Sequence, residues 1–252
     1  MYDIIFIGSS LSNMLASTTI INKKILIIEK DSYLGGAWRV NSNDKKNIDL
    51  VGHLIVPEDN LKGQEIINFF KKIGIELEKI KDSDFTYETE LFKGNNKQGD
   101  SIICKNGWVN FNLKIIEYVK SFKHIDILLD CEINSINCHN NYIDLVSQNN
   151  IFKTKKLVIP MYCNIDKINY DNHYLEIPFQ KIENIHVLIS VSYDSITITK
   201  KFQAFLDKEP LGVFDRITVS EIDKVNKKII LSCRISKNFK KKNDIENFFY
   251  DF

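Results

Sequence analysis

The chain has 252 residues, of which 44% are hydrophobic and 27% are charged, and its formal net charge is +1. This length is sufficient for one large domain or two small ones with a hydrophobic core. The near-neutral charge argues against electrostatic binding to nucleic acid or to an anionic membrane surface, and no apolar run is long enough to span a bilayer.

The cysteines and the first residues bear on the compartment. The five cysteines are odd in number and include no pair with CxxC spacing: Cys104, Cys131, Cys138, Cys163 and Cys233. This pattern favours reduced thiols over a disulfide framework. The first apolar run is too short for the core of a signal peptide, so we expect a cytoplasmic protein.

The first thirty residues predict a βαβ unit. Asp3–Ile7 is a continuous apolar run, typical of a strand buried on both faces of a parallel sheet. Ser9–Ile21 has apolar residues at helical spacing, and either Ser9 or Ser10 is suited to cap its start. Ile25–Ile28 is a second buried strand, and a right-handed crossover is expected between the two strands.

The middle of the chain continues the α/β pattern. The predicted elements are helices over Gly63–Ile73 and Phe111–Phe122 and strands over Ile125–Leu129, Glu132–Asn137, Tyr142–Val146 and Lys156–Pro160. Asn140-Asn141 separates two of these strands and predicts a hairpin turn.

After Pro160 the pattern changes. Cys163–Tyr174 is polar and is predicted to be an irregular connection. The alternating segments beyond it predict an antiparallel sheet with strands over His186–Tyr193, Ser195–Thr199, Arg216–Ser220 and Lys228–Arg234. The aromatic C-terminus, Phe248–Phe252, is suited to dock on the protein itself or on a protein partner.

The turn after the first strand is a reduced dinucleotide fingerprint. Gly8 occupies the first of the three glycine positions, whereas Ser10 and Asn13 occupy the second and third. The start of the following helix still offers free N–H groups and a positive dipole end to a phosphate. Glu29 ends the second strand about twenty residues later, where a carboxylate accepts hydrogen bonds from an adenosine ribose and disfavours a 2′-phosphate. An ordinary strand–helix–strand unit with an acid at the strand end is the alternative.

Other chemistries find little support. Cys138-His139 has no further Cys or His at ligand spacing, so no metal site is expected. No Gly-x-Ser-x-Gly motif is present, which argues against a hydrolase with a nucleophile elbow.

The segments after Glu29 resemble the superfamily of flavin amine oxidases, protoporphyrinogen oxidases and UDP-galactopyranose mutases. Glu29–Arg39 resembles its second signature, in which an acid-ended strand is followed by a Gly-Gly pair, here Gly35-Gly36. Asn47–Ile55 is similar to the superfamily's strand near the flavin, and Asp130–Ile136 resembles the strand whose backbone contacts adenine.

This resemblance implies an α/β protein with a Rossmann-like FAD/NAD(P)-binding domain around a parallel sheet and a smaller domain with an antiparallel sheet. The expected division is residues 1–62 and 105–165 for the dinucleotide-binding domain and 63–104 and 166–252 for the substrate-type domain. The residues it implies for cofactor binding are Gly8, Ser9, Ser10, Leu11, Ser12, Asn13, Glu29, Lys30, Gly35, Gly36, Ala37, Trp38, Gly52, His53 and Ile133. No catalytic acid or base is identified.

Three functional hypotheses follow. The leading one is an FAD-dependent oxidoreductase-like protein that acts on a small molecule, an amine or a nucleotide sugar. The chain is shorter than is usual in the superfamily and lacks the C-terminal Gly-Asp segment that closes the flavin site. These departures favour the second hypothesis, a non-catalytic relative that serves as a binding or partner module. An NAD-binding protein is the third.

Overall fold

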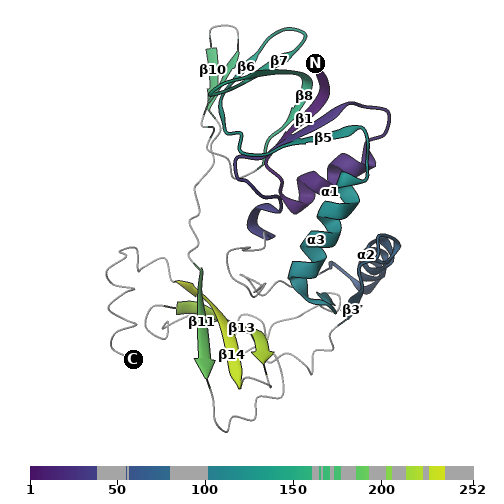
Figure 1. Ribbon diagram of the computed structural model, residues 1–252, viewed down its shortest axis with the longest axis vertical. Helices are drawn as coiled ribbons and strands as arrows, with labels where there is room; N and C mark the ends of the chain where they lie inside the picture. The colour runs from purple at the N-terminus through teal and green to yellow at the C-terminus, as the bar shows by residue number, and fades with distance from the viewer. Residues whose placement is uncertain are drawn as a thin grey trace. The chain divides into compact units, whose positions relative to one another are not determined.

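The computed structural model describes residues 1–38, 55, 57–79, 102–160, 165, 167–170, 173–176, 186–192, 203–205, 214–223 and 227–235 (Figure 1). The chain divides into two compact units. The first unit comprises Met1–Val40 and Val109–Ile182, and the second comprises Asn41–Trp108 and Glu183–Phe252.

The first unit contains an eight-stranded sheet with the order β10-β9-β6-β7-β8-β1-β2-β5. Its strands are β1 (Tyr2–Ile7), β2 (Ile25–Ile28), β5 (Ile125–Leu128), β6 (Ile133–Cys138), β7 (Ile143–Ser147), β8 (Ile151–Val158), β9 (Lys167–Tyr170) and β10 (His173–Glu176). Strands β8, β1, β2 and β5 run parallel to one another. Strand β2 is buried along its whole length, as its continuous apolar run predicts.

Two helices accompany this sheet. Helix α1 (Leu11–Thr19) connects β1 to β2, and helix α3 (Gly107–Lys120) precedes β5. Phe111, Ile115 and Val119 are fully buried on α3, because a spacing of four residues places them on one helix face. A short 3₁₀ helix, η1 (Gly36–Trp38), follows β2.

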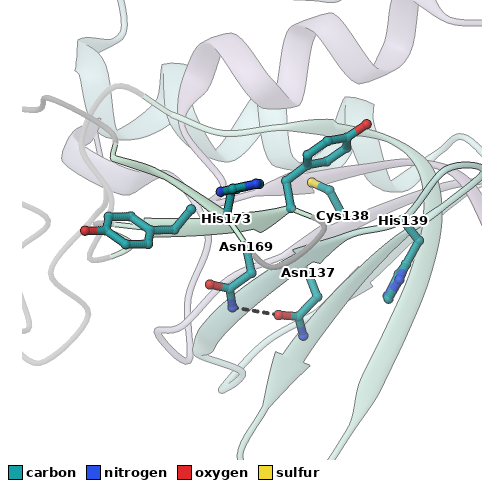
Figure 2. A pocket seen from close by; sticks show the side chains of 7 residues that line it. Asn137, Cys138, His139, Asn169 and His173 are labelled. Atoms are coloured by element: carbon teal, nitrogen blue, oxygen red, sulfur yellow. Dashed lines mark hydrogen bonds between the residues drawn. The ribbon is translucent and has the colours of Figure 1, made fainter.

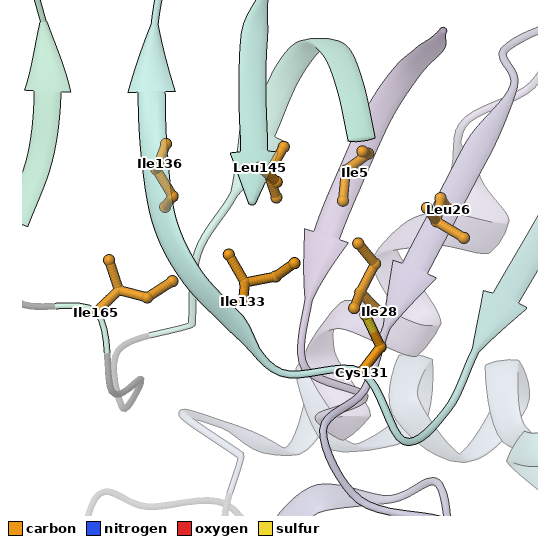
Figure 3. Packing of buried hydrophobic residues seen from close by; sticks show 8 residues of the cluster. All are labelled: Ile5, Leu26, Ile28, Cys131, Ile133, Ile136, Leu145 and Ile165. Atoms are coloured by element: carbon orange, nitrogen blue, oxygen red, sulfur yellow. The ribbon is translucent and has the colours of Figure 1, made fainter. Parts of the chain in front are cut away.

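A cluster of aliphatic side chains ties the parallel strands to the β6–β7 hairpin (Figure 3). Ile5 and Ile28 come from β1 and β2, and Ile136 and Leu145 come from β6 and β7. Strand β8 belongs to both parts, because it pairs antiparallel with β7 through its first half and parallel with β1 through its second half.

The prediction of an irregular connection over Cys163–Tyr174 is wrong. Strands β9 and β10 form an antiparallel hairpin there, and β9 adds to the sheet beside β6. Ile165 is 5% exposed and belongs to the core cluster, with Ile168 packed against it. Both strands are short and lie at the border of the sheet, so their polar residues hide the alternation that would have predicted them.

The remaining differences in the first unit concern boundaries. Strand β8 begins at Ile151, five residues before the predicted start at Lys156. In its first half the exposed Ile151 and Lys153 alternate with the inward-facing Phe152 and Thr154, and this half-exposed pattern is typical of an antiparallel pairing and not of a buried parallel strand.

The second unit contains helix α2 and two antiparallel sheets. Helix α2 covers Asn60–Lys72, with its start capped by the Asp59 side chain. Strands β3 (Leu77–Lys79) and β4 (Ile102–Cys104) pair with each other, and the four-stranded sheet β11-β14-β13-β12 comprises β11 (His186–Ser192), β12 (Gln203–Phe205), β13 (Phe214–Asp223) and β14 (Lys228–Ile235). This sheet confirms the predicted antiparallel strands, except that Ser195–Thr199 and the aromatic C-terminus lie outside the described residues. In the described part of the chain, no helix is long and apolar enough to cross a membrane.

Candidate dinucleotide-binding site

Gly8 makes the turn from β1 into α1. Its φ is +78°, in the left-handed region that glycine adopts at no steric cost, and its N–H donates to the Ile28 carbonyl at 2.7 Å. A Cβ built on Gly8 would lie 3.6 Å from the Pro160 ring, so backbone conformation and not space requires the glycine. The one fingerprint glycine that the chain retains is therefore the one that the turn needs.

Ser9 and Glu29 form a buried polar contact between this turn and the end of β2. Ser9 is 0% exposed and Glu29 is 5% exposed. The Ser9 N–H and O–H both donate to Glu29 Oε2, at 2.7 and 2.6 Å, and the Asp31 N–H donates to Oε1 at 3.1 Å. The predicted ribose carboxylate is thus already hydrogen-bonded within the protein.

Ser10 and Asn13 replace the other two fingerprint glycines, and each uses its side chain locally. Ser10 is the N-cap of α1, and its Oγ accepts from the Asn13 N–H at 3.2 Å. The Asn13 amide donates to the carbonyls of Ile7 and Gly8, both at 2.9 Å. Of the two serines that the sequence offered as caps, Ser10 has this role, whereas Ser9 is bonded to Glu29.

The Gly35-Gly36 pair lies against the same turn. Both glycines have positive φ, at 119° and 56°, and the Gly35 N–H donates to Ser9 Oγ at 3.0 Å. A Cβ on Gly36 would lie only 3.3 Å from the Cα of Ser10. This close approach explains why glycine is needed there, apart from any ligand.

Trp38 follows the glycine pair at the end of η1. Its ring lies 5.6 Å from that of Phe111, centre to centre, at an interplanar angle of 35°. This contact joins the loop after β2 to helix α3.

Helix α3 also carries a residue that the sequence did not single out. Asn112 is 1% exposed, and neither its amide nitrogen nor its amide oxygen has a hydrogen-bond partner in the part of the chain that the structure describes. A buried carboxamide without partners costs about 1–3 kcal/mol. The only sequence signal is an asparagine directly beside the apolar face of an amphipathic helix.

The other residues predicted to bind the cofactor differ in exposure and in packing. The Cys131 N–H donates to the Glu29 carbonyl at 3.0 Å, which brings the chain just before Ile133 next to the end of β2. The Ile133 side chain belongs to the core cluster, so only its main chain is available to a ligand. Lys30 is exposed, and nothing is described for the Ala37 side chain. Gly52 and His53 lie outside the described residues.

The residues present fit a pyrophosphate and a single ribose contact. In the described residues, the N–H groups of Leu11 and Ser12 in the first turn of α1 have no acceptor, and they lie at the positive end of the helix dipole. Three donors occupy the Glu29 carboxylate, which has about four acceptor positions, so one position on Oε1 remains.

A separate open cavity of about 540 Å³ lies at the ends of β6 and β9 and the start of β10 (Figure 2). It is lined by Asn137, Cys138, His139, Asn169, Tyr170, His173 and Tyr174. Strand register aligns Cys138 with Ile143, Thr154 and Tyr2 at the beginning of β1, whereas Gly8 follows the end of β1. This cavity is therefore not part of the dinucleotide site. Within the described residues, no group of three His, Cys, Asp or Glu side chains is placed to hold a metal.

Comparison with known proteins identifies the fold. The sequence matches no known family profile and no curated protein. A solved structure from Exiguobacterium sp. 255-15, described as a candidate protoporphyrinogen oxidase, matches with a TM-score of 0.64 and 8% identity over 97% of this chain and 80% of that one. A putrescine oxidase matches with a TM-score of 0.61 and 9% identity over 98% of this chain and 77% of that one.

The chain shares the FAD/NAD-type Rossmann-like fold of these structures. The predicted α/β class, with a central parallel sheet and a smaller antiparallel sheet, is thereby confirmed. A thioredoxin reductase from Lactococcus lactis matches with a TM-score of 0.34 and 16% identity over 63% of this chain. The match covers 35% of that enzyme, so this chain spans about a third of its length. At these identities the likeness concerns the fold, and the roles of individual residues stay predictions.

Proposed function

We propose that the chain is an FAD-binding oxidoreductase-type protein that acts on a small molecule, an amine or a nucleotide sugar. The observation that carries this proposal is the start of α1, where free N–H groups lie between the Gly8 turn and the closely approaching Gly36. This arrangement offers backbone donors and a helix dipole to a pyrophosphate. The neighbouring structures, which are FAD-dependent oxidoreductases, support the choice of FAD over NAD.

The proposed binding roles follow the order of the cofactor's parts. Residues Gly8–Asn13 bind the pyrophosphate through the main chain, Glu29 accepts from the adenosine ribose, and the main chain at Ile133 contacts adenine. We propose that Gly35 to Trp38 contact the cofactor, and the sequence resemblance assigns the same role to Gly52 and His53, which lie outside the described residues. The bound flavin would supply the redox chemistry, and the protein would bind and orient the substrate.

The substrate side of this proposal rests on the second domain. The proposed division assigns residues 63–104 and 166–252 to it and residues 1–62 and 105–165 to the dinucleotide-binding part, although β9 and β10 join the eight-stranded sheet of the first unit. On the dinucleotide-binding side, Asn112 follows Phe111, which contacts Trp38. The Asn112 carboxamide, which has no partner among the described residues, can both donate to and accept from a bound ligand.

Titration with FAD tests the proposal. The purified protein should carry a flavin absorption spectrum or acquire a protein-bound one when FAD is added, and FAD should raise its unfolding temperature more than NAD does. A colourless protein that FAD neither stabilises nor changes spectrally would refute it.

Gly36→Ala provides a sharper version of the test, because its Cβ would press on Ser10 where the pyrophosphate is proposed to lie. Gly74→Ala is the matched control, since Gly74 has a φ of +78° but nothing within 4 Å of its Cβ position. Both variants strain the backbone, and only Gly36→Ala should weaken FAD binding. Equal affinity of the two variants would argue that FAD does not lie against Gly36.

A second candidate function is a non-catalytic relative that keeps the fold as a binding or partner module. The observation that favours it is the internal hydrogen bonding of Ser9, Asn13 and Glu29, which holds the turn without a ligand. Tight FAD binding together with turnover of an amine or sugar nucleotide would eliminate this candidate.

A further inference from the structure

Ser9 saturates one carboxylate oxygen of Glu29 with hydrogen bonds. Its N–H and its O–H both donate to Oε2, at 2.7 and 2.6 Å, and both side chains are buried. A hydrogen bond from a hydroxyl to a carboxylate at this length is short and charge-assisted. Oε2 therefore has both of its acceptor positions occupied by one residue of the protein.

A second hydrogen bond holds the Ser9 hydroxyl in this orientation. Ser9 Oγ accepts from the Gly35 N–H at 3.0 Å, so its proton is left to point toward Glu29. Rotating Ser9 about χ1 would move Oγ away from both partners, break the bond to Gly35 and leave a buried main-chain donor unpaired, at a cost of about 1–3 kcal/mol. A ligand that binds at the carboxylate therefore finds no free acceptor position on Oε2.

The other oxygen is only half used. Oε1 accepts from the Asp31 N–H at 3.1 Å, and an ionised carboxylate oxygen accepts about two hydrogen bonds. One position is left on the whole carboxylate, whereas the ribose of an adenosine has two hydroxyls.

From these contacts we infer that Ser9 is a specificity-determining residue, because its two hydrogen bonds occupy both acceptor positions of Oε2. Glu29 then recognises an adenosine ribose through one hydroxyl only, at Oε1. This inference rests on the proposed function, because it needs an adenosine-containing ligand at the end of β2. Alanine or glycine at position 9 has no hydroxyl, and it would return one acceptor position on Oε2 to the ligand.

Calorimetric titration with ADP, 2′-deoxy-ADP and 3′-deoxy-ADP tests the inference in the full chain. In the wild-type protein, one deoxy analogue should bind within about twofold of ADP and the other roughly tenfold more weakly, as expected for one lost bond to a charged group. In Ser9→Ala, ADP should bind more tightly and both deoxy analogues should lose about tenfold relative to it.

Two further variants secure the comparison. Ser17→Ala removes an equally buried hydroxyl from the adjoining helix α1, one that bonds to the Met14 carbonyl and not to Glu29, and it should keep the wild-type pattern. Ser9→Gly replaces Ser9→Ala if circular dichroism finds that variant unfolded.

The outcomes separate the inference from the proposed function. Equal penalties for both deoxy analogues in the wild type, or an unchanged pattern in the Ser9 variants, refute the inference and leave the proposed function standing. ADP binding that occurs only after Ser9 is replaced refutes one-hydroxyl recognition by the wild type, and the proposed function then stands or falls with FAD binding by the wild type. Absence of ADP and FAD binding in every variant refutes both.

Discussion

Asn13 stands where a dinucleotide fingerprint has its third glycine, and the variant Asn13→Gly restores that glycine. In this protein the side chain is 7% exposed, and its amide donates to the carbonyls of Ile7 and Gly8, both at 2.9 Å. The variant removes these two bonds at the point where β1 passes into the turn. We therefore expect the restored glycine to destabilise the protein.

The size of the effect follows from those contacts. Two hydrogen bonds between uncharged groups contribute about 2 kcal/mol to the free energy of unfolding. Glycine within a helix costs a few tenths of a kcal/mol more than asparagine. For a chain of this size, 1 kcal/mol corresponds to about 2–4 °C in the unfolding midpoint, so the expected decrease is about 5–10 °C.

Thermal unfolding followed by circular dichroism measures this decrease. Ala16→Gly is the matched control, because Ala16 is exposed on the same helix and its replacement costs only helix propensity, about 1 kcal/mol. The reasoning is refuted if Asn13→Gly unfolds at or above the wild-type temperature, or if its decrease is no larger than that of Ala16→Gly.

Further substitutions and one chemical measurement test other contacts. Ser10→Ala should cost about 1 kcal/mol in denaturant unfolding and Ser10→Gly only a few tenths, and the reverse order would contradict the capping role. Asn112→Leu should raise the unfolding midpoint of the ligand-free protein, because it removes a buried carboxamide that has no partner among the described residues. A lower midpoint would mean that the amide is satisfied. Burial raises the pKa of Cys233 to about 11, so at pH 8 its alkylation should be about a hundredfold slower than in the denatured protein. Mass spectrometry measures the two rates, and equal rates would contradict the raised pKa. The hydrogen bond from Lys155 lowers the pKa of Asp3 below 3.8, so the wild type should be more stable than Asp3→Asn at pH 7. This difference in stability should disappear as the pH falls through the lowered pKa. A difference that persists in acid would point to another cause.

The parallel core of the fold was predictable because burial on both faces leaves a continuous apolar run. Ile25–Ile28 was predicted with the same bounds that the structure gives to β2. Strands β9 and β10 were not predictable in the same way, because a four-residue strand at the sheet border has too few inward residues to establish a period.

The candidate site was predictable in its main-chain geometry and not in its side-chain contacts. Gly8 was identified from its place after a strand, where a tight turn requires positive φ. Glu29 was identified from its spacing, but spacing does not reveal that Ser9 fills one of its oxygens, since that depends on the direction of a hydroxyl. Asn112 carried no motif at all, and only its burial distinguishes it.

The replaced glycines have a common physical consequence. In a glycine-rich turn the main chain is left open for a phosphate, which then orders it; here Ser10 and Asn13 add side chains that bond to the main chain of the turn itself. Ser9 and Glu29 likewise fix the turn to Gly35 from the other side. The turn is thus ordered before any ligand arrives, so binding would cost little conformational entropy. The same order restricts what can bind, because the groups left for a ligand are the first N–H groups of α1 and one position on Glu29.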